Sequence, residues 1–321
     1  MSDASAPEPT FAELVAATNY SFLRGASHPA EMVAEAIALG MRGIGIADRN
    51  SVAGVVRAWG FLKELQVKHP EIVANFRLVV GARLAFADGT PDIVAYPTTR
   101  HGWGRLTRLL STGNLRAQKG DCILYLEDLL QHCDDLLLIA MDGDEALLRI
   151  LKRARPKSVW LAATMPRAGT DARKITARER LSAATRVPLL ATNDALYASI
   201  AQRPLHDIIT CIREGVNIHK AGKLLRANGE RHLKAPAEMM RLFQHHPQAI
   251  EQSAALLARI HFQLDDLRYE YPHEPVPDGW KPFNYLHHLV KTAAEKRYGA
   301  PLKSKVRKLI GNELRLIRKR D

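Results

Sequence analysis

The chain has 321 residues, 46% of them hydrophobic, which is enough to fill one large domain and a smaller appendage. No run of about 18 apolar residues occurs, and the N-terminal sequence MSDASAPEPT has no basic region followed by an apolar stretch, so we expect neither a transmembrane helix nor a signal peptide. These features predict a cytoplasmic protein with no membrane partner. The three cysteines match no metal or redox spacing and are expected to be reduced structural thiols.

The formal net charge of +12 is concentrated near the C-terminus. Residues 281–321 contain 12 Lys or Arg and 3 Asp or Glu, which gives this segment a net charge of +9. Such a field attracts polyanions, and nucleic acid is the most common polyanion in the cytoplasm. Apolar residues recur at close to helical spacing between Val306 and Ile317, so the same charges also fit the solvated face of an amphipathic helix.

Short apolar runs alternate with amphipathic segments along most of the chain, which is typical of repeated βα units. The apolar runs predict strands at 13–18, 43–48, 76–86, 92–97, 135–141, 158–164 and 187–194. The first expected helix begins after Ser27, its predicted N-cap, with Pro29 in the first turn, and ends at Gly40. Further helices are expected at 51–68, 103–115, 144–155, 171–186 and 202–213.

Seven strands with interleaved helices fit either an open doubly wound sheet or a closed barrel, and no GxGxxG or GxxxxGK[ST] motif indicates a common nucleotide-binding fold. After about Gly215 the pattern becomes mainly helical. The proline-rich sequence YEYPHEPVPDGWKP excludes a helix and predicts a stiff linker at 268–282. The expected organisation is therefore a disordered N-terminus at 1–10, a barrel domain at 11–267, this linker, and a basic helical segment at 283–321.

Several separated motifs resemble one known family. TNYSFLRGASHPAEMVAEAIALGMRGIGIADRNSVAGVVRA, followed by VVGARL, HGWGRLTRLLS and PLLATNDALY, is similar to the N-terminal PHP (polymerase and histidinol phosphatase) domain of bacterial C-family DNA polymerases. SFLRGASHP and AGVVRA place the resemblance closest to the error-prone, damage-inducible type. The resemblance implies an α/β fold, a distorted (βα)7 TIM-like PHP barrel, with residues 283–321 similar to the start of the polymerase palm.

In some members of this family the strand ends hold a metal cluster that hydrolyses phosphoesters. Such a cluster needs neutral imidazoles and carboxylates that converge on one point and activate a bound water. Carried over position by position, the resemblance places the family's ligand positions at Val15, Ala17, Asp48, Arg49, Arg83, Gly104, Asp194 and Leu196. Only two carboxylates therefore remain, and two of the ligand positions hold arginine.

Asp48 and Asp194 are accordingly expected to form a vestigial pocket without a metal, because a divalent ion beside two arginines would be repelled at a cost of several kcal/mol. We expect Arg49 or Arg83 to pair with Asp48 or Asp194 and so to replace metal crosslinks by ion pairs. An alternative is an anion-binding pocket in which Arg24, Arg49 and Arg83 hold a phosphate. No cofactor is expected in this chain, although the resemblance implies a divalent metal for the full polymerase.

The resemblance implies the N-terminal module of an error-prone DNA-directed DNA polymerase that acts in DNA replication and damage-induced translesion synthesis. The palm aspartates are absent, so we expect this chain alone to be inactive as a nucleotidyltransferase. Implied partners are DNA, the remainder of the polymerase, a sliding clamp and damage-response accessory proteins. Two alternatives remain open: a free-standing metal-dependent PHP phosphoesterase, and a small nucleic-acid-binding protein. The expected nucleic-acid-binding residues are Lys303, Lys305, Arg307, Lys308, Arg315, Arg318, Lys319 and Arg320.

Overall fold

The computed structural model describes residues 10–267 and 275–319. The chain divides into two compact units, Met1–Leu267 and Arg268–Asp321. Most of the expected disordered N-terminus and the first half of the expected proline-rich linker lie outside the described residues.

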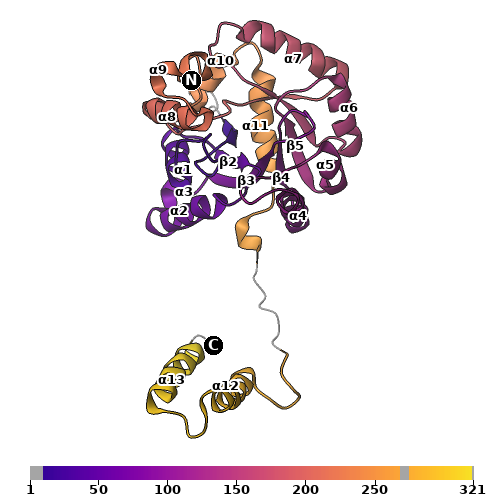
Figure 1. Ribbon diagram of the computed structural model, residues 1–321. Helices are drawn as coiled ribbons and strands as arrows, with labels where there is room; N and C mark the ends of the chain where they lie inside the picture. Colours follow the sequence, from indigo (N-terminus) through magenta and orange to yellow (C-terminus); the bar gives the residue numbers. More distant parts are fainter. Residues whose placement is uncertain (1–9, 268–274, 320–321) are drawn as a thin grey trace, which may run out of the picture. The chain divides into compact units, whose positions relative to one another are not determined.

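The first unit contains one sheet of seven strands whose spatial order follows the sequence from β1 to β7 (Figure 1). These seven strands confirm the strands that the apolar runs predicted. Their bounds are β1 Ala12–Ala16, β2 Gly43–Arg49, β3 Arg77–Leu84, β4 Ile93–Pro97, β5 Leu136–Ala140, β6 Val159–Ala163 and β7 Leu189–Ala191. Most strand residues are fully buried, as expected for strands that are covered on both faces.

Strand β4 departs from the regular βα repeat. It pairs antiparallel with both β3 and β5, whereas the remaining neighbours pair in parallel. The connection 85–92 is too short for the crossover of a dozen or more residues that a parallel neighbour requires. As a result, the residues just before β4 lie at the same edge of the sheet as the ends of β2 and β3.

The sheet curls so that its two edge strands meet. Ala16 and Ala195 form an isolated bridge, and the amide of Ala17 donates a 2.9 Å hydrogen bond to the Ala195 carbonyl. The fully buried carboxylate of Glu13 in β1 accepts hydrogen bonds from the hydroxyl of Thr192 and, at 2.6 Å, from the amide of Asn193. Helix α11 (Pro247–Arg259) packs against both β1 and β7. The fold is thus α/β with a curled seven-stranded half-barrel, which confirms the expected fold class.

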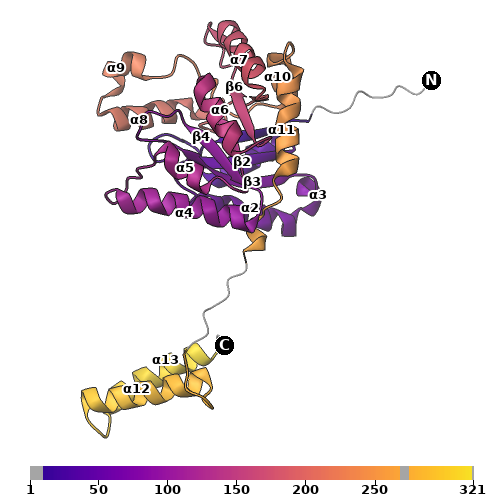
Figure 2. The same ribbon diagram turned by 90° about the vertical axis from the view of Figure 1, so that its right-hand side faces the viewer.

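Helices surround the outside of the curled sheet (Figures 1 and 2). The other helices of this unit are α1 Pro29–Ala38, α2 Val55–Lys68, α3 Pro70–Val73, α4 Arg100–Arg116, α5 Leu126–His132, α6 Glu145–Ala154, α7 Asp171–Thr185, α8 Arg203–Glu214, α9 Ile218–Ala221 and α10 Pro236–Leu242. Inside the sheet, Tyr96 is fully buried and its hydroxyl donates a 2.7 Å hydrogen bond to the Leu14 carbonyl. A Cβ at Gly45 would overlap this hydroxyl, so glycine is needed there.

The second unit consists of α12 (Pro282–Tyr298) and α13 (Ser304–Arg318). Among the described residues 275–319, Ala294 of α12 and Leu314 of α13 are the buried ones, so they mark the packed face of each helix. Among the described residues of the whole chain, no helix is long and apolar enough to cross a membrane.

Candidate functional site

A cavity of about 600 Å³ opens at the carboxyl-terminal edge of the sheet. Its walls come from residues that follow the strands, from α7 and α8, and from the segment 222–231. The three arginines predicted from the sequence, Arg24, Arg49 and Arg83, all line it, and so does Asp194. The structure therefore brings these four side chains to one place from positions as distant as 24 and 194.

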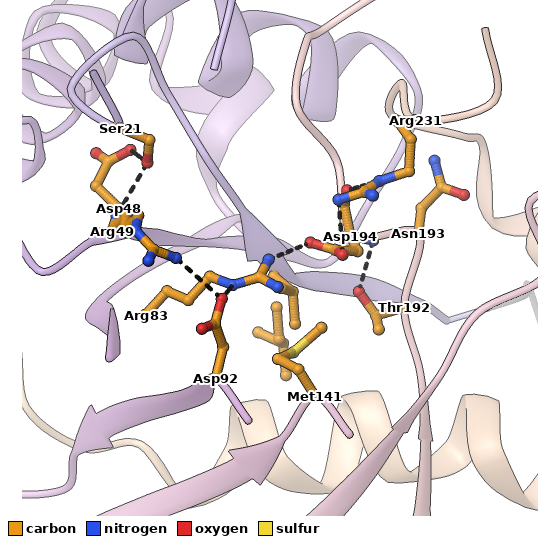
Figure 3. Close-up of polar contacts among 12 residues, drawn as sticks. Ser21, Asp48, Arg49, Arg83, Asp92, Met141, Thr192, Asn193, Asp194 and Arg231 are labelled. Carbon is orange, nitrogen blue, oxygen red and sulfur yellow. Dashed lines mark hydrogen bonds and ion pairs between the residues drawn. The ribbon is translucent and has the colours of Figure 1, made fainter. Parts of the chain in front are cut away.

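Arg83, at the end of β3, connects two aspartates across this cavity (Figure 3). Its Nε lies 2.7 Å from Asp92, and one of its terminal nitrogens lies 2.7 Å from Asp194. The second carboxylate oxygen of Asp194 lies 2.6 Å from Arg231, and Arg49 approaches Asp92 at 3.3 Å. Of the pairings that the sequence left open, the structure contains Arg83 with Asp194. These ion pairs tie the end of β3 to the start of β4 and to the segment after β7.

The network changes the acidity of its members. Burial would raise the pKa of Asp194, but the positive charges of Arg231 and Arg83 outweigh it and lower that pKa below its ordinary value of 3.8. Burial alone would lower the pKa of the Arg83 guanidinium, yet Asp194 and Asp92 raise it. Both partners are therefore held in their charged forms at neutral pH.

Asp48 does not belong to this network, which corrects its expected place in the pocket. It is fully buried and is not among the residues that line the cavity. Its carboxylate accepts hydrogen bonds from the amide and hydroxyl of Thr18, at 2.7 and 2.8 Å, and from the hydroxyl of Ser21 at 2.7 Å. No arginine lies within ion-pair distance of it among the residues described. Burial raises the pKa of Asp48 despite these hydrogen bonds.

The loop 17–28 covers Asp48 because it folds tightly back on itself. A Cβ at Gly25 would collide with the Thr18 carbonyl, so the turn requires glycine. The predicted N-cap at Ser27 is wrong: His28 is the N-cap of α1, and its amide donates a 2.8 Å hydrogen bond to Glu31. The Ser27 hydroxyl instead accepts a 2.7 Å hydrogen bond from the Ala198 amide, which joins the loop to the segment after β7.

The positions that the resemblance assigns to metal ligands do not form a cation site. Val15 is packed in the apolar interior, and Gly104 is exposed on α4 and does not line the cavity. Asp92 and Asp194 are already engaged by guanidinium groups. Within residues 10–267 and 275–319, no group of three or more His, Cys, Asp or Glu is placed to hold a metal ion. The residues present therefore do not fit a PHP-type metal cluster.

Two members of the network were missed by sequence reasoning, Asp92 and Arg231. The signal for Asp92 was the short connection before β4, which excludes a crossover and returns the chain to the same rim. Arg231 lies beyond α8 in a region without strands. Its place in the sequence therefore does not predict that its side chain reaches the strand ends. Its side chain is largely buried, and it also donates a hydrogen bond to the Asp194 carbonyl.

The predicted nucleic-acid-binding residues belong to the second unit. Those from Lys303 to Lys319 are all exposed, and Arg320 lies outside the described residues. No carboxylate lies within ion-pair distance of them in the described part of the chain. The side chain of Arg318 lies over the ring of Phe283, with 5.6 Å between its guanidinium carbon and the ring centroid.

Comparison with known proteins agrees with this architecture. Residues 13–168 match the family model described as the PHP domain, so this part of the chain is a PHP domain. The chain is 47% identical over 313 residues to the error-prone DNA polymerase of Brucella abortus, 44% over 320 residues to that of Caulobacter vibrioides, and 46% over 315 residues to error-prone DNA polymerase 1 of Rhizobium meliloti.

These matches cover 95%, 98% and 96% of this chain but only 29%, 29% and 27% of the relatives. The chain is therefore homologous to the N-terminal region of error-prone DNA polymerases and spans less than a third of their length. An amidohydrolase structure from Chromobacterium violaceum aligns at a TM-score of 0.38 and 11% identity, over 59% of this chain and 88% of that one. That likeness is too weak to bear on function.

Proposed function

We propose that this chain is the non-catalytic PHP module of an error-prone DNA polymerase that acts in DNA replication and damage-induced translesion synthesis. In this module, arginine–aspartate ion pairs take the place of metal crosslinks at the strand ends. The observation that carries the proposal is Arg83, which stands at a position that the resemblance assigns to a metal ligand and pairs with both Asp92 and Asp194. A guanidinium fixed between two carboxylates supplies connections between strands but no activated water.

The level of identity to error-prone polymerases supports the polymerase context. A chimera tests it, in which this chain replaces the matching region of the Brucella abortus polymerase and the purified protein is assayed by primer extension. We expect extension comparable to that of the parent enzyme. The same chimera with Arg83→Met should lose thermal stability and extension together, whereas Arg49→Met, which removes a longer and more exposed contact, serves as the matched control. A well-folded chimera without extension would contradict the proposal.

We also propose that the exposed basic face of α13 contacts DNA. Charge on such a face binds phosphates and releases counterions, so the logarithm of the affinity should fall linearly with the logarithm of the salt concentration, by about 0.9 for each duplex phosphate contact. The test is a salt titration of DNA binding by the chain and by a variant with Lys305, Arg307, Lys308 and Arg315 changed to Gln. The variant should bind more weakly and with a shallower slope.

A matched control neutralises two exposed cations of the first unit. Arg173 and Arg180 lie on α7 and have no carboxylate partner among the residues described. Their change to Gln should leave both the affinity and the salt slope nearly unaltered. Losses in proportion to the four and two charges removed would show that DNA responds only to net charge. Unchanged binding in the α13 variant would show that this face is merely solvated.

A further inference from the structure

The residues that line the cavity at the strand ends carry more positive charge than their ion pairs neutralise. Eight lysine and arginine residues line it against three aspartates, which leaves a net charge of +5. The eight cations are Arg24, Arg49, Arg83, Lys174, Arg213, Lys223, Arg226 and Arg231. Like charges gathered around a hollow repel one another, and a bound anion relieves that repulsion.

Four of the eight cations have carboxylate partners. Arg83 and Arg231, which are largely buried, and Arg49 pair with Asp92 and Asp194. Arg213 pairs with Glu214, which does not line the cavity. Towards the solvent, Arg24, Lys174, Lys223 and Arg226 are exposed, and within residues 10–267 and 275–319 no carboxylate lies within 4.0 Å of their side-chain nitrogens. The floor of the cavity is therefore neutralised by protein groups, whereas its mouth is not.

Arg24 interacts with cations from distant segments of the chain. Partial burial lowers the pKa of Arg24, and the charges of Arg49 and Arg213 lower it further. At the floor of the cavity, the positive charge of Arg226 helps to lower the pKa of Asp194. Arg24 precedes α1 and Arg226 follows α9, so the fold itself brings these guanidinium groups to one opening.

A neighbouring side chain also lacks a partner. His206 of α8 lines the cavity, is 3% exposed, and has an Nδ1 atom with no hydrogen-bond partner in the described part of the chain. Burial is the main reason that its pKa falls from 6.5 to about 4, and the charge of Arg226 contributes. The imidazole is thus neutral at pH 7 and adds no charge, but it leaves hydrogen-bonding capacity unused beside the cations.

We propose that this cavity is a binding site for a small molecule that carries a chain of phosphate groups, held at the mouth by Arg24, Arg226 and Lys223 and not hydrolysed. Guanidinium groups suit phosphate oxygens because their planar fork donates two parallel hydrogen bonds. A single phosphate group supplies at most about two negative charges, fewer than the excess here, whereas a chain of phosphates supplies more. The volume of about 600 Å³ lies in the range of small-molecule sites.

The test is isothermal titration of the full chain without magnesium, at constant ionic strength, with sodium tripolyphosphate, dATP, orthophosphate and a single-stranded oligonucleotide as separate probes. We expect saturable 1:1 binding of tripolyphosphate and dATP, clearly tighter than binding of orthophosphate, with both ligands recovered intact. Equal affinity for tripolyphosphate and dATP would mean that only the phosphates are recognised, and tighter binding of dATP would mean that the base contributes. Either result supports the site.

Two variants make the test specific. Arg24→Gln with Arg226→Gln should weaken tripolyphosphate binding about tenfold or more, because two charge-assisted contacts are lost. Neither side chain has an ion pair with a described residue, so the variant should fold, which circular dichroism verifies. The α7 control, Arg173→Gln with Arg180→Gln, should bind as the unaltered chain does.

Three results would overturn the inference. They are no saturable binding, equal weakening in both variants, and orthophosphate binding as tight as tripolyphosphate binding. Oligonucleotide binding that is lost in the Arg24 and Arg226 variant, with no tripolyphosphate binding, would assign the cavity to nucleic acid instead. None of these outcomes depends on the primer-extension test of the chimera.

Discussion

A terminal guanidinium nitrogen of Arg83 lies 2.7 Å from the Asp194 carboxylate, which joins the end of β3 to the segment that follows β7. These two positions are 111 residues apart in sequence and are separated by three strands of the sheet. The contact therefore crosses the mouth of the curled sheet. It gives the strand ends a connection of the kind that a shared metal ion would otherwise supply.

Removal of the Arg83 guanidinium should destabilise the fold. Arg83→Met leaves Asp194 with Arg231 alone and leaves Asp92 with the weaker Arg49 contact. We expect a loss of about 2–3 kcal/mol in the free energy of unfolding, measured by urea denaturation, because the largely buried Asp194 carboxylate loses one of its two partners. Arg49→Met removes a 3.3 Å contact with partners 35% and 25% exposed and should cost less than about 1 kcal/mol. Equal losses would contradict the role of Arg83.

Asp194 should make stability fall in acid. Its pKa is lowered in the folded state, so its contribution is fully present above the ordinary value of 3.8 and is lost as the pH falls through the folded value. Asp194→Asn should therefore be much less stable than the unaltered chain at pH 7, and the difference should shrink as the pH drops below 3.8. Urea unfolding of both proteins across this range measures it. A stability difference between the two proteins that does not change with pH would contradict the ion pairs of Asp194.

Asp48 should show the opposite dependence. Its pKa is raised in the folded state, so the folded form binds the proton more tightly and loses stability as the pH rises from 3.8 through the folded value. In Asp48→Asn, the retained oxygen still accepts from the Thr18 amide and Ser21 hydroxyl, and the new amide faces the Thr18 hydroxyl. The stability of Asp48→Asn relative to the unaltered chain should be highest near neutral pH and should fall in acid. Parallel pH profiles for Asp48→Asn and Asp194→Asn would contradict their different environments.

The turn at Gly25 should not tolerate a side chain. Gly25→Ala brings a Cβ into the Thr18 carbonyl and should cost about 1–3 kcal/mol, with increased proteolysis of the loop 17–28. Gly60 lies in α2, and a Cβ there meets nothing within 4 Å. Gly60→Ala should therefore stabilise the chain by up to about 1 kcal/mol, because alanine favours the helix. Urea denaturation compares the two, and a harmless Gly25→Ala would show that the turn is adaptable.

Much of the fold could be predicted from the sequence because strands buried on both faces consist of continuous apolar residues. All seven were found in this way, and helices such as α7 were placed almost to the residue. The reversal of β4 was missed because an apolar run carries no direction, although the short connection before it indicates an antiparallel neighbour. The N-cap of α1 was misplaced by one residue because Ser27 and His28 both precede Pro29, and only the fold shows that the Ser27 hydroxyl is engaged elsewhere.

The site could be predicted only where strand ends define it. Arg83 lies at the end of β3 and Asp194 follows β7, so their contact was one of the pairings that the sequence left open. Asp48 also lies at a strand end, but the loop 17–28 folds over it and supplies three hydrogen bonds that spacing does not reveal. Arg226 and Arg231 come from a region after α8 without strands, so their approach depends on tertiary packing alone.

We propose that ion pairs take the place of a metal cluster in this PHP domain. The most direct test is elemental analysis of the untagged chain after equilibration with zinc and manganese and removal of unbound ion, together with an assay on a generic phosphoester. We predict metal far below one ion per chain and no metal-dependent turnover. Stoichiometric metal, with turnover abolished by Asp48→Ala, would contradict the claim.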